Sequence, residues 1–436
     1  MRLRDIFEID FPLFFASILL TLFGILFIYS SGFASTEKVT STEYIRQIVW
    51  AAVGVILALG ISLFNFRRVY DVSLYLYLAT IALLIYTCLF GRLINGARAW
   101  IGVGPFGIQP SEFAKITTIL FLARHLDSTR HSENIVSRFV LSCVIVFIPM
   151  FIILLQPDFG TSLVFIPILL IMAFIGGISM RYIAFLGGGV VLTGLMMVLP
   201  LWQETILGGA FPAVMILINL RFVLGCAAAL ALIGGVAFFG YIRYKKRYFY
   251  WICYIAVLLI ISLSGSFASH KVLKEYQIMR LIVFLDPNVD PRGSGWHIIQ
   301  SMTAIGSGGL MGKGFLQGTQ SHYRFLPQQS TDFIFSIFTE EWGFFGGILV
   351  FALFLLICLR LIWLMKNTTD AFGAYIAAGL AAMYAFHFLV NVGMAMGVMP
   401  ITGIPLLFMS YGGSALISAM IGVGLAMSIR VRRFQR

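Results

Sequence analysis

The chain has 436 residues, of which 60% are hydrophobic and only 11% are charged, and its mean hydropathy is +0.96. These values exclude an ordinary soluble globular protein, and the continuous apolar runs exclude a transmembrane β-barrel, whose strands alternate. The net charge of +12 does not indicate nucleic-acid binding, because the basic residues cluster at the ends of the apolar runs, where they orient a membrane protein. The composition therefore predicts an all-α polytopic membrane protein.

Hydropathy, read with about twenty residues per span, predicts about twelve transmembrane helices. The first is kept as a span, because it is too long for a signal peptide and lacks a small-residue cleavage site. An even number of spans places both chain ends on one side of the membrane. In chain order the helices are expected near 11–31, 47–65, 70–90, 110–125, 138–155, 161–179, 182–201, 222–241, 249–267, 333–363, 372–391 and 405–429.

The distribution of basic residues sets the orientation. With a cytoplasmic N-terminus, the inner connections hold most of the Arg and Lys, including the basic run 243–247, and the short outer loops hold few. The long segment 268–332 then forms a large extracytoplasmic loop before the tenth helix. Residues 203–221 are apolar but interrupted, so we expect an interfacial or re-entrant helix there.

The residues that usually bind metals give no recognisable site. All five cysteines lie inside apolar runs, where they resemble small hydrophobes. His297 and His322 have no second His or Cys at ligand spacing. No dedicated metal motif is therefore predicted.

Ionisable residues near the outer membrane surface are candidates for function. Glu112 and Lys115 lie at i and i+3 at the start of the fourth span and therefore share a helix face. They either form an internal salt bridge or mark a substrate path, and both readings stay open. Asp158, in a tight turn before the sixth span, is either an N-cap or a site residue. The small residues of 410–414 favour close helix packing.

The loop 268–332 is unusually long and chemically varied for a simple connection, so we interpret it as part of an active site. Asp332 directly precedes an apolar run, where partial desolvation would raise its pKa and make it a usable base. The alternative is that Thr331 or Asp332 caps the next helix. For Glu340 and Glu341, deeper in that helix, structural pairing is favoured over catalysis.

Together these motifs resemble the SEDS family (shape, elongation, division and sporulation), and specifically its RodA-type elongation branch. The resemblance implies one SEDS domain over 1–436, with the family core of ten spans and two extra spans in an inserted flank, 203–267. The matching stretches are collinear and cover most of the chain outside 202–275: Gln109-Pro-Ser-Glu112-Phe-Ala-Lys115, Gln156-Pro-Asp158-Phe-Gly-Thr161, Phe284-Leu-Asp-Pro, Asp290-Pro, Ile298-Ile-Gln-Ser301, Ala304-Ile-Gly-Ser-Gly-Gly309, Gly318-Thr-Gln-Ser321, Phe325-Leu-Pro327, Thr331-Asp-Phe-Ile-Phe335 and Ser410-Tyr-Gly-Gly-Ser414.

The sequence departs from the family pattern at two positions. Gln328 and Ser330 stand where the family usually has Glu and His, so the contribution of those residues is absent or is supplied differently.

The resemblance implies a peptidoglycan glycosyltransferase that polymerises lipid II during cell elongation, at the outer face of the bacterial inner membrane. It also implies a complex with a class B penicillin-binding protein. The new β-linkage forms from an α-linked undecaprenyl pyrophosphate, so the anomeric centre inverts in one displacement. One carboxylate base plus cations then suffices, unlike the carboxyl pair of a glycoside hydrolase.

We expect Asp332 to be that base or to position the acceptor hydroxyl, as the resemblance also implies. Glu112, Lys115 and Asp158 would line the same cavity. Lys115 would face the pyrophosphate, with Arg98, Lys313 and Arg324 as weaker candidates, and a divalent cation (Mg²⁺ or Mn²⁺) is compatible with this scheme. The alternatives are a lipid II flippase, the division-branch SEDS polymerase, and a non-catalytic scaffold for a penicillin-binding protein.

Overall fold

A computed structural model describes residues 10–33, 41–94, 97–103, 106–206, 214, 217, 219–272, 275–290, 293–323, 325–326 and 328–433. The contacts divide the chain into two compact units. The first comprises Met1–Ile178 with His297–Arg436, and the second is Ser179–Trp296. The predicted flank 203–267 falls within the second unit, whereas the assignment of one domain to the whole chain stays a prediction.

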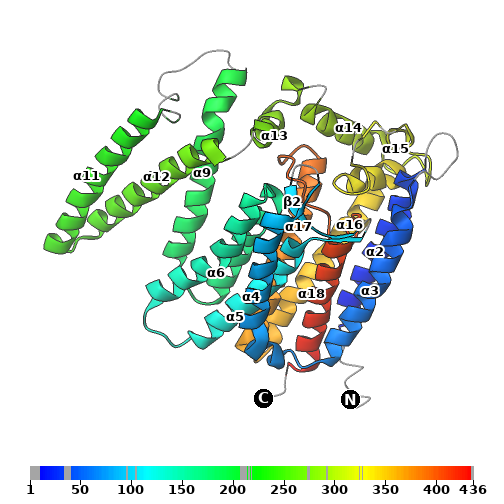
Figure 1. Ribbon diagram of the computed structural model, residues 1–436, viewed down its shortest axis with the longest axis horizontal. Helices are drawn as coiled ribbons and strands as arrows, with labels where there is room; N and C mark the ends of the chain where they lie inside the picture. Colours follow the sequence, from blue (N-terminus) through cyan, green and yellow to red (C-terminus); the bar gives the residue numbers. More distant parts are fainter. Residues whose placement is uncertain are drawn as a thin grey trace. The chain divides into compact units, whose positions relative to one another are not determined.

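The first unit is a bundle of long helices with one small sheet (Figure 1). Its described elements are α2 (Phe11–Ser31), α3 (Glu43–Leu63), α4 (Arg67–Phe90), β1 (Arg92–Ile94), β2 (Ala97–Val103), β3 (Phe106–Ile108), α5 (Pro110–Ser128), α6 (Ile135–Leu155), α7 (Phe159–Leu163), α8 (Phe165–Ile175), most of α14 (Ser294–Ser307), α15 (Thr319–His322), α16 (Ile334–Asn367), α17 (Ala371–Ala395) and α18 (Gly413–Val431).

Two helices form the centre of this bundle. In α17 and α18, 67% and 83% of the most apolar window is buried inside the protein, against 22% in α3, so α3 has a much larger outward face. Helix α18 packs on α3, and α17 packs on α5, α8 and α16. At one end, Asp10 before α2 pairs with Arg430 of α18 at 2.7 Å and with Arg360 of α16 at 2.9 Å. The described chain therefore starts and ends on the same side of the bundle.

A three-stranded antiparallel sheet, β1-β2-β3, connects α4 to α5. The hydropathy analysis did not predict strands in this connection. Pairing of Ile101 with Ile108 returns the chain to Gln109, and Pro110 then begins α5, where proline's missing N–H costs no hydrogen bond.

Helix α16 begins at Ile334, one residue after the predicted start of the tenth span, but it is interrupted. Gly343 has φ +65° and ψ −162°, which is not helical. At this break the segment 309–314 supplies backbone partners: the N–H groups of Lys313 and Gly314 donate to the carbonyls of Glu340 and Glu341, both at 3.0 Å. Residues 334–341 before the break are all buried in the protein. This first part of α16 is therefore an internal element.

We expect Gly343→Ala to destabilise the protein by about 1–3 kcal/mol or more. A Cβ at this position would clash with the backbone of Leu310 and Gly312. The alanine would also have to keep the positive φ of Gly343, which L-residues rarely adopt. Thermal unfolding in detergent measures the effect. The matched control is Gly60→Ala in α3, where an added Cβ meets nothing within 4 Å and helix propensity favours alanine. Equal stability of the two variants would contradict the role assigned to Gly343.

The second unit contains α9 (Met180–Ile206), α11 (Leu220–Tyr244), α12 (Arg247–Val272), α13 (Glu275–Leu285) and the 3₁₀ helix η1 (Pro287–Val289). Within it α12 packs on both α11 and α9. Of the interfacial segment expected at 203–221, residues 203–206 continue α9 and 220–221 begin α11, and most of the remainder lies outside the described residues.

The described part of 268–332 is not one irregular loop. It holds the end of α12, then α13, η1, α14 and α15. Hydropathy did not predict these short helices, because they do not register as apolar runs of spanning length, and the extracytoplasmic placement of 268–332 stays a prediction.

The structure has a helix at each of the twelve predicted span positions, and ten of its described helices are long and apolar enough to cross a membrane. The other two positions hold α5, which carries Glu112, Lys115, Arg124 and Asp127, and α7 with α8, which meet at Val164. The count of twelve therefore stays a prediction. The last helix begins at Gly413 and not near 405, because residues 401–406 have no regular secondary structure, although Ile401, Ile404 and Leu406 are buried.

Candidate functional site

Glu112 and Lys115 form a buried ion pair on α5. Lys115 Nζ donates to Glu112 Oε2 at 2.8 Å, and the two side chains are 0% and 3% exposed, respectively. The salt-bridge reading of this pair is therefore confirmed. The charges of this buried pair also act strongly on neighbouring groups, because the low dielectric around the pair screens them weakly.

His387 of α17 extends the pair. Its Nε2 lies 3.0 Å from Lys115 Nζ, and its Nδ1 lies 3.0 Å from the carbonyl of Pro405. A carbonyl can only accept, so we assign the proton to Nδ1, which leaves Nε2 to accept from the ammonium group. Sequence reasoning missed His387, although an imidazole inside an apolar span is a signal of function or pairing.

Asp158 caps α7, as one of its two readings predicted. Its carboxylate accepts from Thr161 N at 3.2 Å and Thr161 Oγ1 at 2.8 Å. It also accepts from Gln109 Nε2 at 2.8 Å, immediately before α5. Burial raises the pKa of Asp158 above its ordinary value, against the opposing effect of the hydrogen bonds from Thr161, and the nearby Glu112 raises it further. Asp158 therefore belongs to the same neighbourhood as the α5 pair.

Asp332 lies half-buried in the turn before α16. The N-cap of α16 is Phe333, so neither Thr331 nor Asp332 holds that position, and the Thr331 hydroxyl donates to Gln328 instead. Two contacts hold the Asp332 backbone: its N–H donates to Gln328 O at 3.2 Å, and its carbonyl accepts from Asn391 Nδ2 at 3.0 Å.

The segment 401–406 contacts several of these residues. The carbonyls of Ile404 and Pro405 accept from Asn391 and His387. Thr402 O lies so close to Gly160 of α7 that a Cβ there would clash. The structure therefore assembles Glu112, Lys115 and Asp158 around one segment and connects Asp332 to it through Asn391. We call these four residues with His387 and Asn391 the α5–α17 cluster.

Lys313 belongs to a different cluster. Its Nζ lies 2.7 Å from Glu340 Oε1 and 2.7 Å from Thr319 Oγ1. The backbone N–H groups of Thr319 and Gln320 also donate to Glu340 Oε1. This is the structural pairing expected for Glu340. A role of Lys313 toward substrate stays a prediction.

Glu341, the neighbour of Glu340, accepts hydrogen bonds from the Ser30 hydroxyl and, at 3.0 Å, from Leu316 N. No ion pair of Glu341 occurs among the described residues.

Of the other two predicted cations, the structure describes only Arg98. Arg98 is exposed on β2 opposite Leu93, and Arg324 lies outside the described residues. Within the described ranges, no three His, Cys, Asp or Glu side chains gather closely enough to hold a metal ion.

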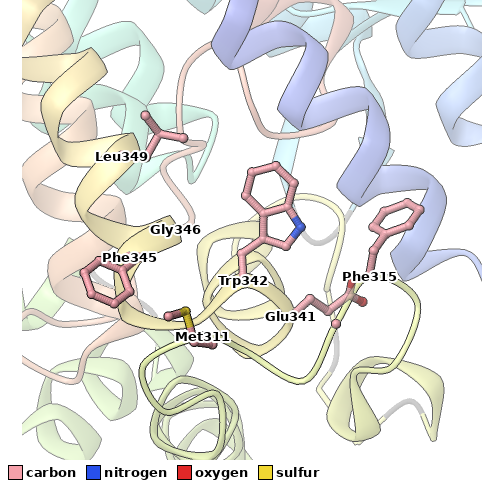
Figure 2. A pocket seen from close by; sticks show the side chains of 8 residues that line it. Met311, Phe315, Glu341, Trp342, Phe345, Gly346 and Leu349 are labelled. Carbon is pink, nitrogen blue, oxygen red and sulfur yellow. The ribbon is translucent and has the colours of Figure 1, made fainter.

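A pocket of about 470 Å³ lies beside the α16 break. Figure 2 shows Glu341 and Trp342 of α16 with Met311 and Phe315 of the preceding segment around it. Phe345, Gly346 and Leu349 extend its apolar wall along α16. None of the α5–α17 cluster residues lines this pocket.

Known proteins resemble the chain along nearly its whole length. Peptidoglycan glycosyltransferase RodA of Treponema pallidum (strain Nichols) is 51% identical over 433 residues, covering 99% of this chain and 100% of that protein. Peptidoglycan glycosyltransferase MrdB of Escherichia coli (strain K12) is 32% identical over 388 residues, covering 89% and 85%.

Solved structures show the same fold. A chain in "Structural coordination of polymerization and crosslinking by a peptidoglycan synthase complex" has a TM-score of 0.67 at 28% identity, covering 98% of this chain and 99% of that one. Rod shape determining protein RodA of Thermus thermophilus has a TM-score of 0.61 at 24% identity, covering 98% of each. The FtsW/RodA/SpoVE family model, described as "Cell cycle protein", matches residues 11–209 and 200–435. This multi-pass membrane protein therefore belongs to the FtsW/RodA/SpoVE family.

Proposed function

We propose that this chain is a peptidoglycan glycosyltransferase that polymerises lipid II into glycan strands during cell elongation. The full-length similarity to Treponema pallidum RodA supports the activity. The observation that carries the site assignment is the α5–α17 cluster, where a carboxylate-bearing turn is connected to a buried Glu112–Lys115 pair through one helix. Ionisable groups held together inside a membrane protein are costly and mark function.

Asp332 is the proposed general base. The acceptor sugar hydroxyl must lose its proton as its oxygen attacks the anomeric carbon, while the bond from that carbon to the pyrophosphate breaks. The pyrophosphate is a weak base and leaves without protonation, so the electron pair goes to an anion that requires charge neutralisation. Asp332 takes the proton, and the anomeric centre inverts from α to β.

Lys115 is the proposed first partner of the pyrophosphate, with Arg98, Lys313 and Arg324 as further candidates. Glu112 and Asp158 would border the same site. A divalent cation (Mg²⁺ or Mn²⁺) would share the neutralisation when bound.

We place the protein in the bacterial inner membrane with both termini cytoplasmic and the active site extracytoplasmic. The basic residues at the inner span ends and the Asp10–Arg430 contact support this orientation. The proposed partner is a class B penicillin-binding protein, whose transpeptidase would crosslink the new glycan. The resemblance to a chain of a peptidoglycan synthase complex supports such a partner. The lipid tail stays in the bilayer and enters between helices.

Polymerisation of purified lipid II by the purified protein, with and without its penicillin-binding partner, tests the proposal. We expect glycan chains from the protein with its partner. A parallel assay follows labelled lipid II across the bilayer of protein-containing vesicles. Transbilayer movement without polymer would favour a flippase, and neither activity would favour a scaffold.

A further inference from the structure

We propose that His387 and Asn391, one turn apart on α17, are positioning residues. They fix where the Lys115 ammonium group and the Asp332 turn lie relative to each other. This inference rests on the proposed function, because it gives both held residues a role in glycosyl transfer. Neither positioning residue reaches substrate in this scheme; each acts through the residue that it holds.

His387, which positions Lys115, is only 1% exposed. We call its contact with Lys115 the His387 half of the proposal. With the proton on Nδ1 donated to Pro405, Nε2 accepts one N–H of the Lys115 ammonium group. Glu112 accepts another, at 2.8 Å. Two acceptors from different helices fix the direction of an otherwise flexible side chain. The remaining N–H of Lys115 therefore has a set direction.

Asn391, which positions the Asp332 turn, is fully buried. Its contact with Asp332 is the Asn391 half of the proposal. Its Nδ2 donates to Asp332 O at 3.0 Å and to Ile404 O at 2.8 Å. Its Oδ1 has no hydrogen-bond partner among the described residues, so the two donated bonds orient the amide. Because one bond goes to the Asp332 backbone, Asn391 sets where the turn before α16 lies.

His387 and Asn391 make the same pattern of contacts. His387 and Asn391 lie at i and i+4 and therefore on one face of α17. Each forms one bond to a predicted site residue and one to a successive carbonyl, Pro405 or Ile404. The segment 401–406 has no regular secondary structure, so these carbonyls are available as acceptors. One helical turn thus connects the proposed base and the proposed pyrophosphate partner.

Buried hydrogen bonds of His387 could serve stability alone. Two variants separate that role from the positioning of Lys115 for the reaction. In His387→Asn the side-chain amide can replace Nδ1 toward Pro405 but does not reach Lys115. In His387→Gln the longer side chain reaches the Nε2 position and can accept from Lys115. If the bond to Lys115 matters for the reaction, Gln retains kcat and Asn loses about 10- to 100-fold, the range that a displacement of about 1 Å produces. Loss with Gln and retention with Asn would overturn the His387 half.

For Asn391 the test is a double-variant cycle in lipid II polymerisation. Asn391→Leu removes both donated bonds at similar volume, and we expect kcat to fall about 10- to 100-fold while KM changes by less than about twofold. In an Asp332→Asn background the same change should cost less than about threefold, because the group that it positions is already gone. An equal factor in both backgrounds would overturn the Asn391 half while leaving the polymerase activity intact.

Failure of the proposed function looks different from failure of this inference. A wild-type protein that makes no glycan with its partner would overturn the function and, with it, the positioning roles. Full activity of Asp332→Asn would overturn the base and the Asn391 half together, whereas the His387 comparison would still report on Lys115. If Asn391→Leu does not fold, Asn391→Gln, which keeps the amide on a longer stem, replaces it in the cycle with the same expected direction.

Discussion

Asp332→Asn is expected to lower the rate of glycan polymerisation by about 10²- to 10⁴-fold, the usual contribution of a general base. Asparagine has nearly the same shape as aspartate but cannot take a proton from the acceptor hydroxyl. The fold should survive, because the change keeps the size of the side chain and leaves two backbone contacts in place: the N–H to Gln328 O and the carbonyl that accepts from Asn391 Nδ2. Initial rates on purified lipid II, with the penicillin-binding partner present, measure the change.

A matched control for Asp332→Asn is Asp71→Asn, which makes the same chemical change at an exposed position of α4. It should polymerise at the wild-type rate. If Asp332→Asn also did so, Asp332 would not be the base, and Asp158, whose pKa is raised by burial, would become the first candidate.

Hydropathy predicted the ends of a helix correctly where polar or capping residues bound the apolar run on both sides. The first span was predicted at 11–31 and observed at Phe11–Ser31, because Asp10 caps it at one side and Gly32 follows it at the other. The last was predicted from 405 and begins at Gly413. Ile404 and residues 406–409 are buried, and an apolar run reports burial whether or not the segment is helical.

The break in α16 could not be predicted, because its cause is tertiary. Neither Gly343 nor the polar residues Glu340 and Glu341 before it signal a break by themselves, and the backbone conformation at Gly343 is accompanied by hydrogen bonds between the flanking residues and 309–314. The same holds for Glu340, whose paired oxygen takes its donors from residues far earlier in the chain.

In the site, local spacing predicted local geometry. Glu112 and Lys115 at i and i+3 do form a pair, and Asp158 does cap the following helix. His387 and Asn391 were missed because their partners are distant in sequence: His387 is 272 residues from Lys115, and Asn391 is 59 from Asp332. One sequence carries no signal for such pairs beyond a polar residue in an apolar span.

Lys115→Met is expected to lower the free energy of unfolding by about 3–5 kcal/mol, the usual cost of removing one partner of a buried ion pair. The variant leaves the Glu112 carboxylate buried without its cation, and His387 Nε2 without its donor. Thermal unfolding in detergent or nanodiscs, with wild type in parallel, measures the loss. Wild-type stability of Lys115→Met would contradict the buried charge pair.

The double variant Lys115→Met with Glu112→Gln should recover most of that stability, because it removes the unpaired charge and keeps the side-chain volumes similar. Its activity then separates the two readings of the pair, which stability alone cannot do. If Lys115 only holds α5 to α17, the stable double variant polymerises lipid II at close to the wild-type rate. If Lys115 faces the pyrophosphate as proposed, the double variant is stable and still polymerises at least about tenfold more slowly, because the charge that stabilises the leaving group is absent.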